Sequence, residues 1–160
     1  MYRIKKEILI NSTPKKVWEV FADIEKWPEL CSYVSKVYWN TSKKWTLDSS
    51  FTQVIVNIIP LKKNVSHTKF IKIIPGKIVT WTGTRTLIKG VHTLKFKKIN
   101  NAGKSKISGT NFVGKTKVSN IEYFKGPLAP IIFPFIKNRF EHYFEQFLKG
   151  LKGKVEKQKA

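Results

Sequence analysis

Few side chains in this sequence can carry acid–base chemistry at neutral pH. The sequence holds three histidines and two aspartates: His67, His92, His142, Asp23 and Asp48. His92 is the best catalytic candidate, because it alternates with Leu94 and so is expected to share an inward face with it. A lone imidazole among apolar residues is more often a hydrogen bonder in a core or pocket, since catalysis also requires a group that orients it. The sequence shows no such acid near His92. We therefore assign no catalytic residue and keep His92 as a candidate.

Metal and cofactor chemistry find no support in the residue spacing. One cysteine, Cys31, and three scattered histidines offer no paired ligands of the kind that zinc sites show. The sequence also lacks a dinucleotide-binding fingerprint and a Gly-x-Ser-x-Gly nucleophile elbow. Cys31 is expected to be a small buried hydrophobe and not a reactive thiol. We therefore expect no metal site and no cofactor.

The charge of the chain is its strongest compositional feature. Its 160 residues include 31 Lys and Arg against 10 Asp and Glu, which gives a formal net charge of +21. Such an excess attracts polyanions, so a basic module that docks on anionic lipid or nucleic acid is one alternative. Only Arg3, Arg85 and Arg139 are arginines, however, and lysine lacks the planar fork that binds phosphates and guanine edges bidentately. We expect a solvated lysine surface, with no specific nucleic-acid partner and at most a transient contact with an anionic membrane.

Length and cysteine content suggest a small intracellular domain. A chain of 160 residues is expected to form one domain over 1–160, with a frayed basic tail at its end. The lone cysteine forbids an intrachain disulfide, and the first residues lack the apolar segment of a signal peptide, so a cytoplasmic location is expected. The longest apolar run, 128–136, contains two prolines and is shorter than a membrane span. We expect a monomer or a weak dimer.

Hydrophobic periodicity predicts a strand, two short helices, six further strands and a long helix. Residues 2–10 alternate as a strand, and Thr13 and Pro14 predict a capped helix start, followed by a second short helix over 23–30. Six runs rich in β-branched and aromatic residues then follow, with short connections that favour antiparallel neighbours; they cover 34–43, 48–59, 64–74, 77–85, 88–99 and 105–118. The last helix is expected to end near 157. It carries one apolar stripe, which must cover the sheet: Ile136, Phe140, Tyr143, Phe144, Phe147, Leu151 and Val155.

Several local motifs resemble those of a known family. Four parts of the chain are similar to the polyketide cyclase/dehydrase and lipid-transport family of the START-like (SRPBCC) superfamily. They are the segment from Pro14 through Val17 and Trp18, the later Trp27–Pro28 pair, residues 75–81 with the following Lys89–Gly90, and residues 126–130. The resemblance spans nearly the whole chain. It implies an α+β helix-grip fold, in which a curved seven-stranded antiparallel sheet wraps around the long C-terminal helix.

A sheet that grips one helix encloses a tapered apolar space, which is a ligand pocket by default. Alternation predicts a lining of ten residues from the sheet and the last helix: Val54, Val56, Ile58, Trp81, His92, Leu94, Phe96, Phe140, Phe144 and Phe147. Each of these is about as well explained as ordinary core. Arg85 is expected to pair with a carboxylate or phosphate head group of the ligand.

The favoured function is the binding and transport of a hydrophobic small molecule, such as a lipid, an isoprenoid or a quinone, without catalysis. The alternative is a cyclase or dehydratase that acts on a polyketide-like or aromatic substrate, with His92 as the acid–base residue. The apolar segment 126–134, flanked by Lys125 and Lys137, is a candidate contact with a membrane, although a packed start of the last helix explains it better.

Overall fold

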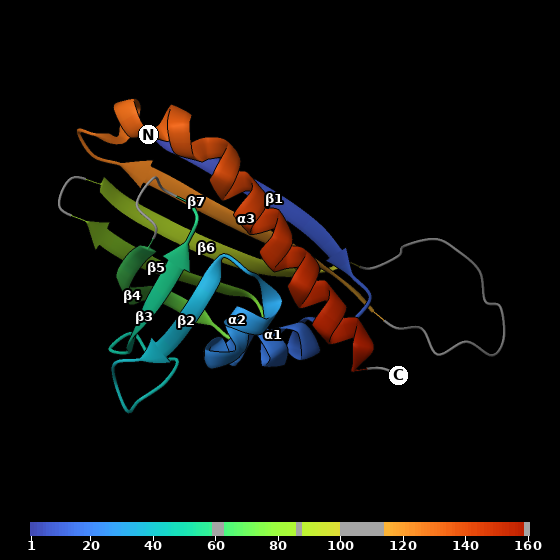
Figure 1. Cartoon of the computed structure of the whole chain (residues 1–160). Helices are drawn as coiled ribbons and strands as arrows, with labels where there is room; N and C mark the ends of the chain where they lie inside the picture. Colours follow the sequence, from blue (N-terminus) through green and yellow to red (C-terminus); the bar gives the residue numbers. More distant parts are fainter. Residues whose placement is uncertain (59–62, 86–87, 100–113, 159–160) are drawn as a thin grey trace, which may run out of the picture.

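The computed structural model describes residues 1–58, 63–85, 88–99 and 114–158, with the side chains of Lys63, Thr84 and Arg85 excepted. In this described part, seven strands and three α-helices follow one another in the predicted order (Figure 1). They are β1 (Tyr2–Ile10), α1 (Pro14–Ala22), α2 (Trp27–Leu30), β2 (Val34–Trp39), β3 (Ser50–Val56), β4 (Lys63–Ile74), β5 (Ile78–Arg85), β6 (Ile88–Ile99), β7 (Lys115–Lys125) and α3 (Ala129–Lys157). A short 3-10 turn, Ile24–Lys26, joins α1 to α2.

The seven strands form one antiparallel sheet with the order β1-β7-β6-β5-β4-β3-β2. The sheet curls around α3, which runs diagonally across its concave side, while α1 and α2 close one end (Figure 1). Every consecutive pair from β2 to β7 is a sheet neighbour, and β1 joins at the far edge beside β7. This arrangement confirms the predicted helix-grip architecture.

Local chemistry explains where the helices start. Thr13 caps α1, because its side chain accepts a hydrogen bond from the Lys16 amide at 3.4 Å, and Pro14 occupies the first turn. Gly126 has a φ of 129°, which ends β7 and turns the chain into α3. Among the described helices, none is long and apolar enough to cross a membrane.

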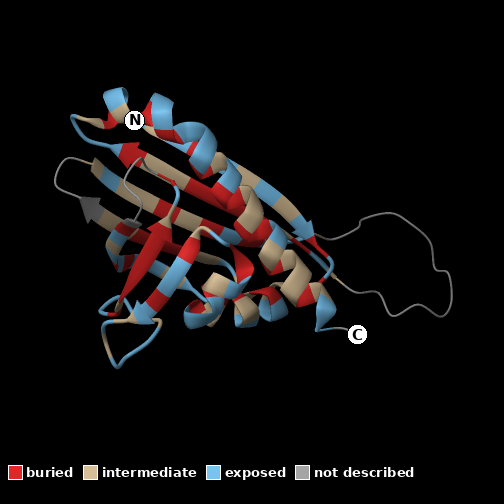
Figure 2. Ribbon diagram, in the orientation of Figure 1, coloured by how far each residue is buried: buried red, intermediate tan, exposed pale blue. Residues whose placement is uncertain are grey.

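The apolar stripe of α3 is buried as predicted (Figure 2). Phe144 and Leu151 are fully buried, and the rest of the stripe is at most 6% exposed. Burial of this stripe against the concave side of the sheet stabilises the helix, since isolated helices gain little stability from propensity alone.

Three strands, β2, β3 and β7, have bounds that differ from the prediction by more than one residue. β7 runs over Lys115–Lys125 and not over 105–118, of which residues 105–113 lie outside the described part. Its extent follows from pairing with the whole of β1, from Tyr2 opposite Phe124 to Ile10 opposite Thr116. β2 ends at Trp39 and not at 43, and β3 covers Ser50–Val56 and not 48–59. β3 ends at Val56 because Asn57 adopts a left-handed φ of 62° that breaks the pleat.

Candidate functional site

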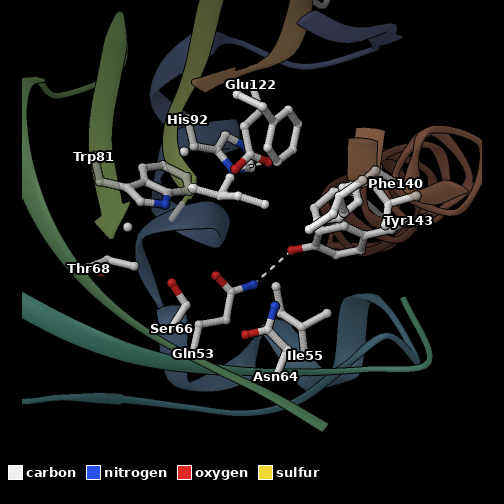
Figure 3. A pocket seen from close by; sticks show the side chains of 16 residues that line it. Gln53, Ile55, Asn64, Ser66, Thr68, Trp81, His92, Glu122, Phe140 and Tyr143 are labelled. Carbon is white, nitrogen blue, oxygen red and sulfur yellow. Dashed lines mark hydrogen bonds and ion pairs between the residues drawn. The ribbon is translucent and has the colours of Figure 1, made fainter. Parts of the chain in front are cut away.

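A cavity of about 230 Å³ lies between the concave side of the sheet and the N-terminal half of α3 (Figure 3). Sixteen described residues line it: Gln53, Ile55, Asn64, Ser66, Thr68, Trp81, Gly83, Ile88, Gly90, His92, Glu122, Phe124, Ile132, Ile136, Phe140 and Tyr143. The α3 side is apolar except for Tyr143, whereas most of the polar groups come from the strands. Such a mixture of apolar walls and a few convergent polar groups is typical of small-molecule sites.

A pair of glycines opens the floor of the cavity. Gly83 on β5 lies directly opposite Gly90 on β6, and both line the space. A Cβ at Gly83 would lie 2.7 Å from the Ser66 hydroxyl oxygen, and a Cβ at Gly90 would lie 2.6 Å from a Glu122 carboxyl oxygen. The missing side chains therefore leave room both for the cavity and for these two polar groups. Glycine within a strand often marks a place where another molecule approaches the backbone closely.

Glu122 and His92 form a buried pair at one side of the cavity (Figure 3). They lie opposite each other on β7 and β6, with His92 Nδ1 3.7 Å from Glu122 Oε2. Burial raises the pKa of the Glu122 carboxyl to about 8. Burial also lowers the pKa of His92 to about 4, although a hydrogen bond to Asn120 opposes this shift. At neutral pH the two groups are therefore a neutral acid and a neutral imidazole, and not an ion pair.

The surroundings of His92 fix its orientation and its tautomer. Its ring stacks on Trp81 with centroids 4.3 Å apart and contacts Phe144 at 5.0 Å. The Asn120 side-chain oxygen accepts a hydrogen bond from His92 Nε2. The proton of the neutral ring therefore lies on Nε2, and the lone pair of Nδ1 faces Glu122.

Amide and hydroxyl groups occupy the opposite side of the cavity. Gln53 Nε2 donates a hydrogen bond to the Tyr143 hydroxyl at 2.8 Å, which ties β3 to α3 across the space (Figure 3). Burial raises the pKa of Tyr143, so this hydroxyl is neutral. Asn64 is only 9% exposed, and its side-chain oxygen has no hydrogen-bond partner among the described residues. A buried acceptor without a partner is unfavourable unless something else satisfies it.

The structure brings several predicted residues together at the cavity. Trp81, His92 and Phe140 line it. Leu94 and Phe147 line a separate small cavity of about 10 Å³, whose lining also includes Trp81, His92 and Tyr143 from the lining of the main space. Phe144 lies behind His92 in the core.

Other predicted lining residues are placed elsewhere. On β3 the cavity is lined by Gln53 and Ile55, so the expected inward facing of Val54 and Val56 was wrong by one residue. Every residue from Phe51 to Ile55 is buried, which hides the alternation that the prediction needed. Ile58 follows the break at Asn57 and is buried in the core without lining the cavity.

Phe96 and Arg85 complete the predicted set. Phe96 packs in the core, with its ring 5.4 Å from Phe21 and 5.7 Å from Trp18, and does not line the cavity. The side chain of Arg85 lies outside the described residues. A role for it in binding a ligand head group stays a prediction.

Glu122, Asn64 and the glycine pair were not predicted from the sequence to line the cavity. Glu122 lies in the part of β7 that was not expected to be a strand, so its alternation with Asn120 and its pairing with His92 could not be inferred. The signal that could have found it is the strand-like run that continues to Gly126, since a strand paired with β1 would extend that far.

The remaining reactive residue types are not at the cavity. His67 is exposed and bonds to Thr52, and His142 is exposed on α3 beside Gln146. Cys31 is buried as predicted, and burial raises the pKa of its thiol, which disfavours the reactive thiolate. Within the described ranges, no cluster of three or more His, Cys, Asp or Glu side chains could hold a metal ion.

One further sequence pattern, Gly-x-x-x-x-Gly-Lys-Thr over 109–116, has the spacing of a phosphate-binding loop. Its residues 109–113 lie outside the described part, and Lys115 and Thr116 begin β7. A phosphate-binding loop leads into a helix, whereas this segment leads into a strand. Thr116 is buried and donates its hydroxyl proton to the Ser12 carbonyl at 2.6 Å, so it is already engaged. The described geometry does not support a nucleotide site here.

Comparison with known proteins agrees with this fold. The model of the family described as polyketide cyclase / dehydrase and lipid transport matches residues 1–156. No curated protein sequence matches this chain significantly.

Solved structures with similar folds cover nearly the whole chain. TTHA0849 from Thermus thermophilus superposes with a TM-score of 0.73 at 13% identity, covering 99% of this chain and 100% of that one. The Zhui aromatase/cyclase from Streptomyces sp. R1128 has a TM-score of 0.73 at 11% identity, covering 99% and 96%. A START superfamily protein from Mycobacterium smegmatis has a TM-score of 0.67 at 12% identity, covering 99% of each chain. Identities this low establish a common fold and nothing about ligands.

Proposed function

The chain belongs to the polyketide cyclase/dehydrase and lipid transport family, and on this premise we propose that it binds an apolar small molecule in the cavity under α3 and carries it unchanged. The observation that supports this most is the cavity itself, about 230 Å³ in volume, in a domain that is otherwise closely packed with aromatic rings. Protein interiors rarely leave such a space empty, because every unfilled volume forfeits packing energy. A cavity kept open by two glycines is therefore best explained by an occupant.

The direct test is to extract the purified protein with solvent and to weigh the intact protein by native mass spectrometry. A bound apolar molecule at a stoichiometry near one supports the proposal. Ile132→Trp places a larger side chain from α3 into the cavity and is expected to abolish retention. Its matched control is Ile131→Trp, at a neighbouring position that is 63% exposed and does not line the cavity. Retention that is the same in both variants, or absent from the wild type under all loading conditions, contradicts the proposal.

A dehydratase activity is the second candidate, and the Glu122–His92 pair is the observation that favours it. A buried carboxyl that stays protonated at neutral pH can protonate a departing hydroxyl. His92 Nδ1 would accept the α-proton of a β-hydroxy ketone while Glu122 protonates the hydroxyl, which leaves as water. The proton on His92 would then return to Glu122 across the 3.7 Å gap. The lowered pKa of His92 makes it a weak base, and for this reason we place catalysis second.

This second candidate can be tested with 4-hydroxy-4-phenylbutan-2-one, whose dehydration gives a conjugated enone that absorbs in the ultraviolet. Catalysis predicts enone formation faster than in buffer, which is lost in both Glu122→Gln and His92→Phe. A wild-type rate equal to that of buffer, or an unchanged rate in both variants, removes the candidate.

Contact with an anionic membrane fits a carrier, and the start of α3 supports it. Ile131 and Phe135 are 63% and 78% exposed and lie four residues apart on one face of the helix, with Arg139 on the same face. Lys89, near the start of β6, lies opposite Lys125, the last residue of β7, just before the turn into α3. An apolar projection with basic neighbours matches an anionic bilayer surface.

Sedimentation with phosphatidylcholine vesicles, with and without phosphatidylserine, tests this contact. We expect binding only to the vesicles that contain phosphatidylserine, weakened about tenfold by Phe135→Ser and by raised salt. The control is Ile71→Ser, which removes an apolar side chain that is 52% exposed on β4. Equal losses in the two variants, or no binding to either kind of vesicle, contradict the contact.

A further inference from the structure

The acidic residues of this protein are distributed unevenly between its helices and its sheet. No acidic residue occurs between Asp48 and Glu122, a stretch that holds strands β3 to β6 and the first half of β7. Of the 10 Asp and Glu residues, only Glu7 and Glu122 lie on strands, and Glu122 lines the cavity. On the described strands, Glu7 is therefore the one acidic side chain that the outer face of the sheet presents.

Lysines gather on this outer face near the last residues of β6 and the first residues of β7. Successive residues of a strand point to opposite faces, and His92, Leu94 and Glu122 point inward, so the odd-numbered residues of β6 and β7 point outward. β1 has the same phase, since Ile4 lies opposite Glu122. Five outward lysines, four exposed and one half-buried, form what we call the lysine face: Lys5, Lys95, Lys97, Lys115 and Lys117.

The protein itself neutralises the lysine face poorly. One carboxyl group, that of Glu7, serves two of its members and lies 3.0 Å from both Lys5 Nζ and Lys117 Nζ. The other three lysines form no ion pair with a described residue. Lys97 and Lys117 also lie directly opposite each other on β6 and β7, and like charges in this arrangement destabilise a sheet. Unfavourable local arrangements that a sequence keeps are expected at functional sites.

The exposed lysines of α3 are arranged differently. Lys137, Lys149 and Lys152 each have a glutamate four residues away, at 3.9 Å or less. Mixed signs of this kind keep a surface soluble without creating a strong field. A face with one sign of charge instead attracts polyanions over about a Debye length. The lysine face thus has the character of a docking surface for an anionic partner.

The shape of the lysine face favours a flexible polyanion. The face lies on the convex side of the sheet, away from α3 (Figure 1). A flat bilayer touches a convex surface only locally, whereas a single strand of nucleic acid can bend over it. Lys95 and Lys97 are two residues apart on one strand, and so are Lys115 and Lys117, which spaces each pair by about 7 Å. The phosphates of an extended nucleic acid strand recur at a similar spacing.

We propose that the lysine face binds the phosphate backbone of a single-stranded nucleic acid without regard to base sequence. Lysine contacts phosphates as a point charge and lacks the planar fork that reads base edges. The sheet separates this face from the cavity, so the contact is independent of the proposed ligand. It is also separate from the start of α3, because β7 runs from Lys115 at the lysine face to Lys125 beside that helix start.

Fluorescence anisotropy of a labelled oligouridylate tests the contact. The variant Lys95→Gln/Lys97→Gln/Lys115→Gln removes the three lysines that have no ion pair. We expect it to bind about tenfold more weakly at low salt. The slope of log Kd against log salt concentration should become shallower by about 2, since each lost phosphate contact removes about 0.7. The variant should melt no lower than the wild type, because it relieves the repulsion between Lys97 and Lys117.

The matched control removes the same charge from α3 through Lys137→Gln/Lys149→Gln/Lys152→Gln. Both triple variants have the same net charge, so any difference between them reports where the charge lies. The control should keep the affinity of the wild type within about twofold and should keep its salt slope.

Three results would overturn the inference. Equal losses in the two triple variants would mean that net charge alone attracts the oligonucleotide. Failure of the wild type to bind it at low salt would remove the contact altogether. Weakened binding of the lysine-face variant to phosphatidylserine vesicles, with unchanged binding of the oligonucleotide, would assign the face to a lipid surface. Retention of an apolar molecule should be the same in both variants, so none of these results decides the proposed function.

Discussion

The two halves of the interior lie under the same helix but are filled differently. Toward the C-terminal end of α3 the space is packed with aromatic rings, with the Trp27 ring 5.1 Å from Phe21, 5.6 Å from Phe51 and 5.4 Å from Phe147. Toward the N-terminal end, the space beside Phe140 is a cavity of about 230 Å³. We call these the solid half and the hollow half.

The difference between the solid half and the hollow half arises because the inward-facing side chains change along the length of each strand, and not because different strands build the two halves. On β5 the inward row changes from Trp81 to Gly83, and on β3 it changes from Phe51 to Gln53. On β4 the same row changes from Phe70 to Thr68, Ser66 and Asn64. Along these three strands, large rings thus give way to mostly small or polar side chains toward the hollow half. The sheet frame alone does not make the pocket, because the same strands build both halves.

Truncating one ring in each half should give the largest contrast in stability. Trp27→Ala is expected to lower the free energy of unfolding by about 4 kcal/mol, because it leaves a large void and removes the hydrogen bond from Trp27 Nε1 to the Phe21 carbonyl. Phe140→Ala should lower it by only about 2 kcal/mol, since this ring already faces the cavity on one side. Urea unfolding followed by circular dichroism measures both values. Losses of equal size would show that the hollow half is packed as tightly as the solid half.

Two glycines of α3 test how closely the solid half is packed. A Cβ at Gly150 would lie 1.9 Å from the Leu30 carbonyl oxygen, where α3 crosses the end of α2. Gly150→Ala must therefore push the helices apart and is expected to lower the free energy of unfolding by about 3 kcal/mol. Gly153→Ala, one turn later in open space, should raise it by about 0.5–1 kcal/mol through helix propensity. Similar effects at the two positions would contradict the close approach of α2 and α3.

Features with a strong local period could be predicted from the sequence. The apolar stripe of α3 repeats every three to four residues over its buried length. The bounds of β6, Ile88–Ile99, agree with the prediction, because its alternation is regular and polar residues, Asn100 and Asn101, follow it in the sequence. The inward face of β3 could not be predicted, because five successive buried residues leave no alternation of buried and exposed side chains to follow. Which face of a strand points inward depends on how that strand pairs with its neighbours in the sheet, and this pairing is not encoded within one segment.

The residues of the candidate site also differ in how well the sequence predicts them. His92 was found because it alternates with Leu94 within one strand, whereas Glu122 is its neighbour only through the pairing of β6 with β7. The raised pKa of Glu122 likewise comes from burial under the assembled fold, and no sequence pattern reports it. A contrasting carboxyl, Glu7 on the adjacent β1, bonds to Ser119 and lies near Lys5 and Lys117, which lower its pKa to about 2.

The sharpest test of the hollow half is the pH dependence that Glu122 introduces. In the unfolded chain a glutamate loses its proton near its ordinary pKa of 4.5, whereas folded Glu122 keeps it up to about 8. The folded state thus binds more protons over this range, so Glu122 makes stability fall as pH rises, by at most about 1.4 kcal/mol per pH unit. His92 acts in the opposite direction between about 4 and 6.5, so the net fall should emerge above pH 6.5.

Glu122→Gln keeps the shape of the side chain but cannot ionise, and it should therefore remove the fall. The variant is expected to match the wild type near pH 4.5, and its advantage in free energy of unfolding should grow by about 2 kcal/mol between pH 6.5 and pH 8, as measured by urea unfolding of ligand-free protein. Glu7→Gln is the control on the outer surface: since the folded pKa of Glu7 is lowered, its stabilising effect is present above about 4.5 and lost only toward pH 2. Its curve should run parallel to that of the wild type between pH 6.5 and 8. A parallel curve for Glu122→Gln as well would mean that the carboxyl is ionised and hydrated in the folded protein, and that the polar side of the cavity is open to water.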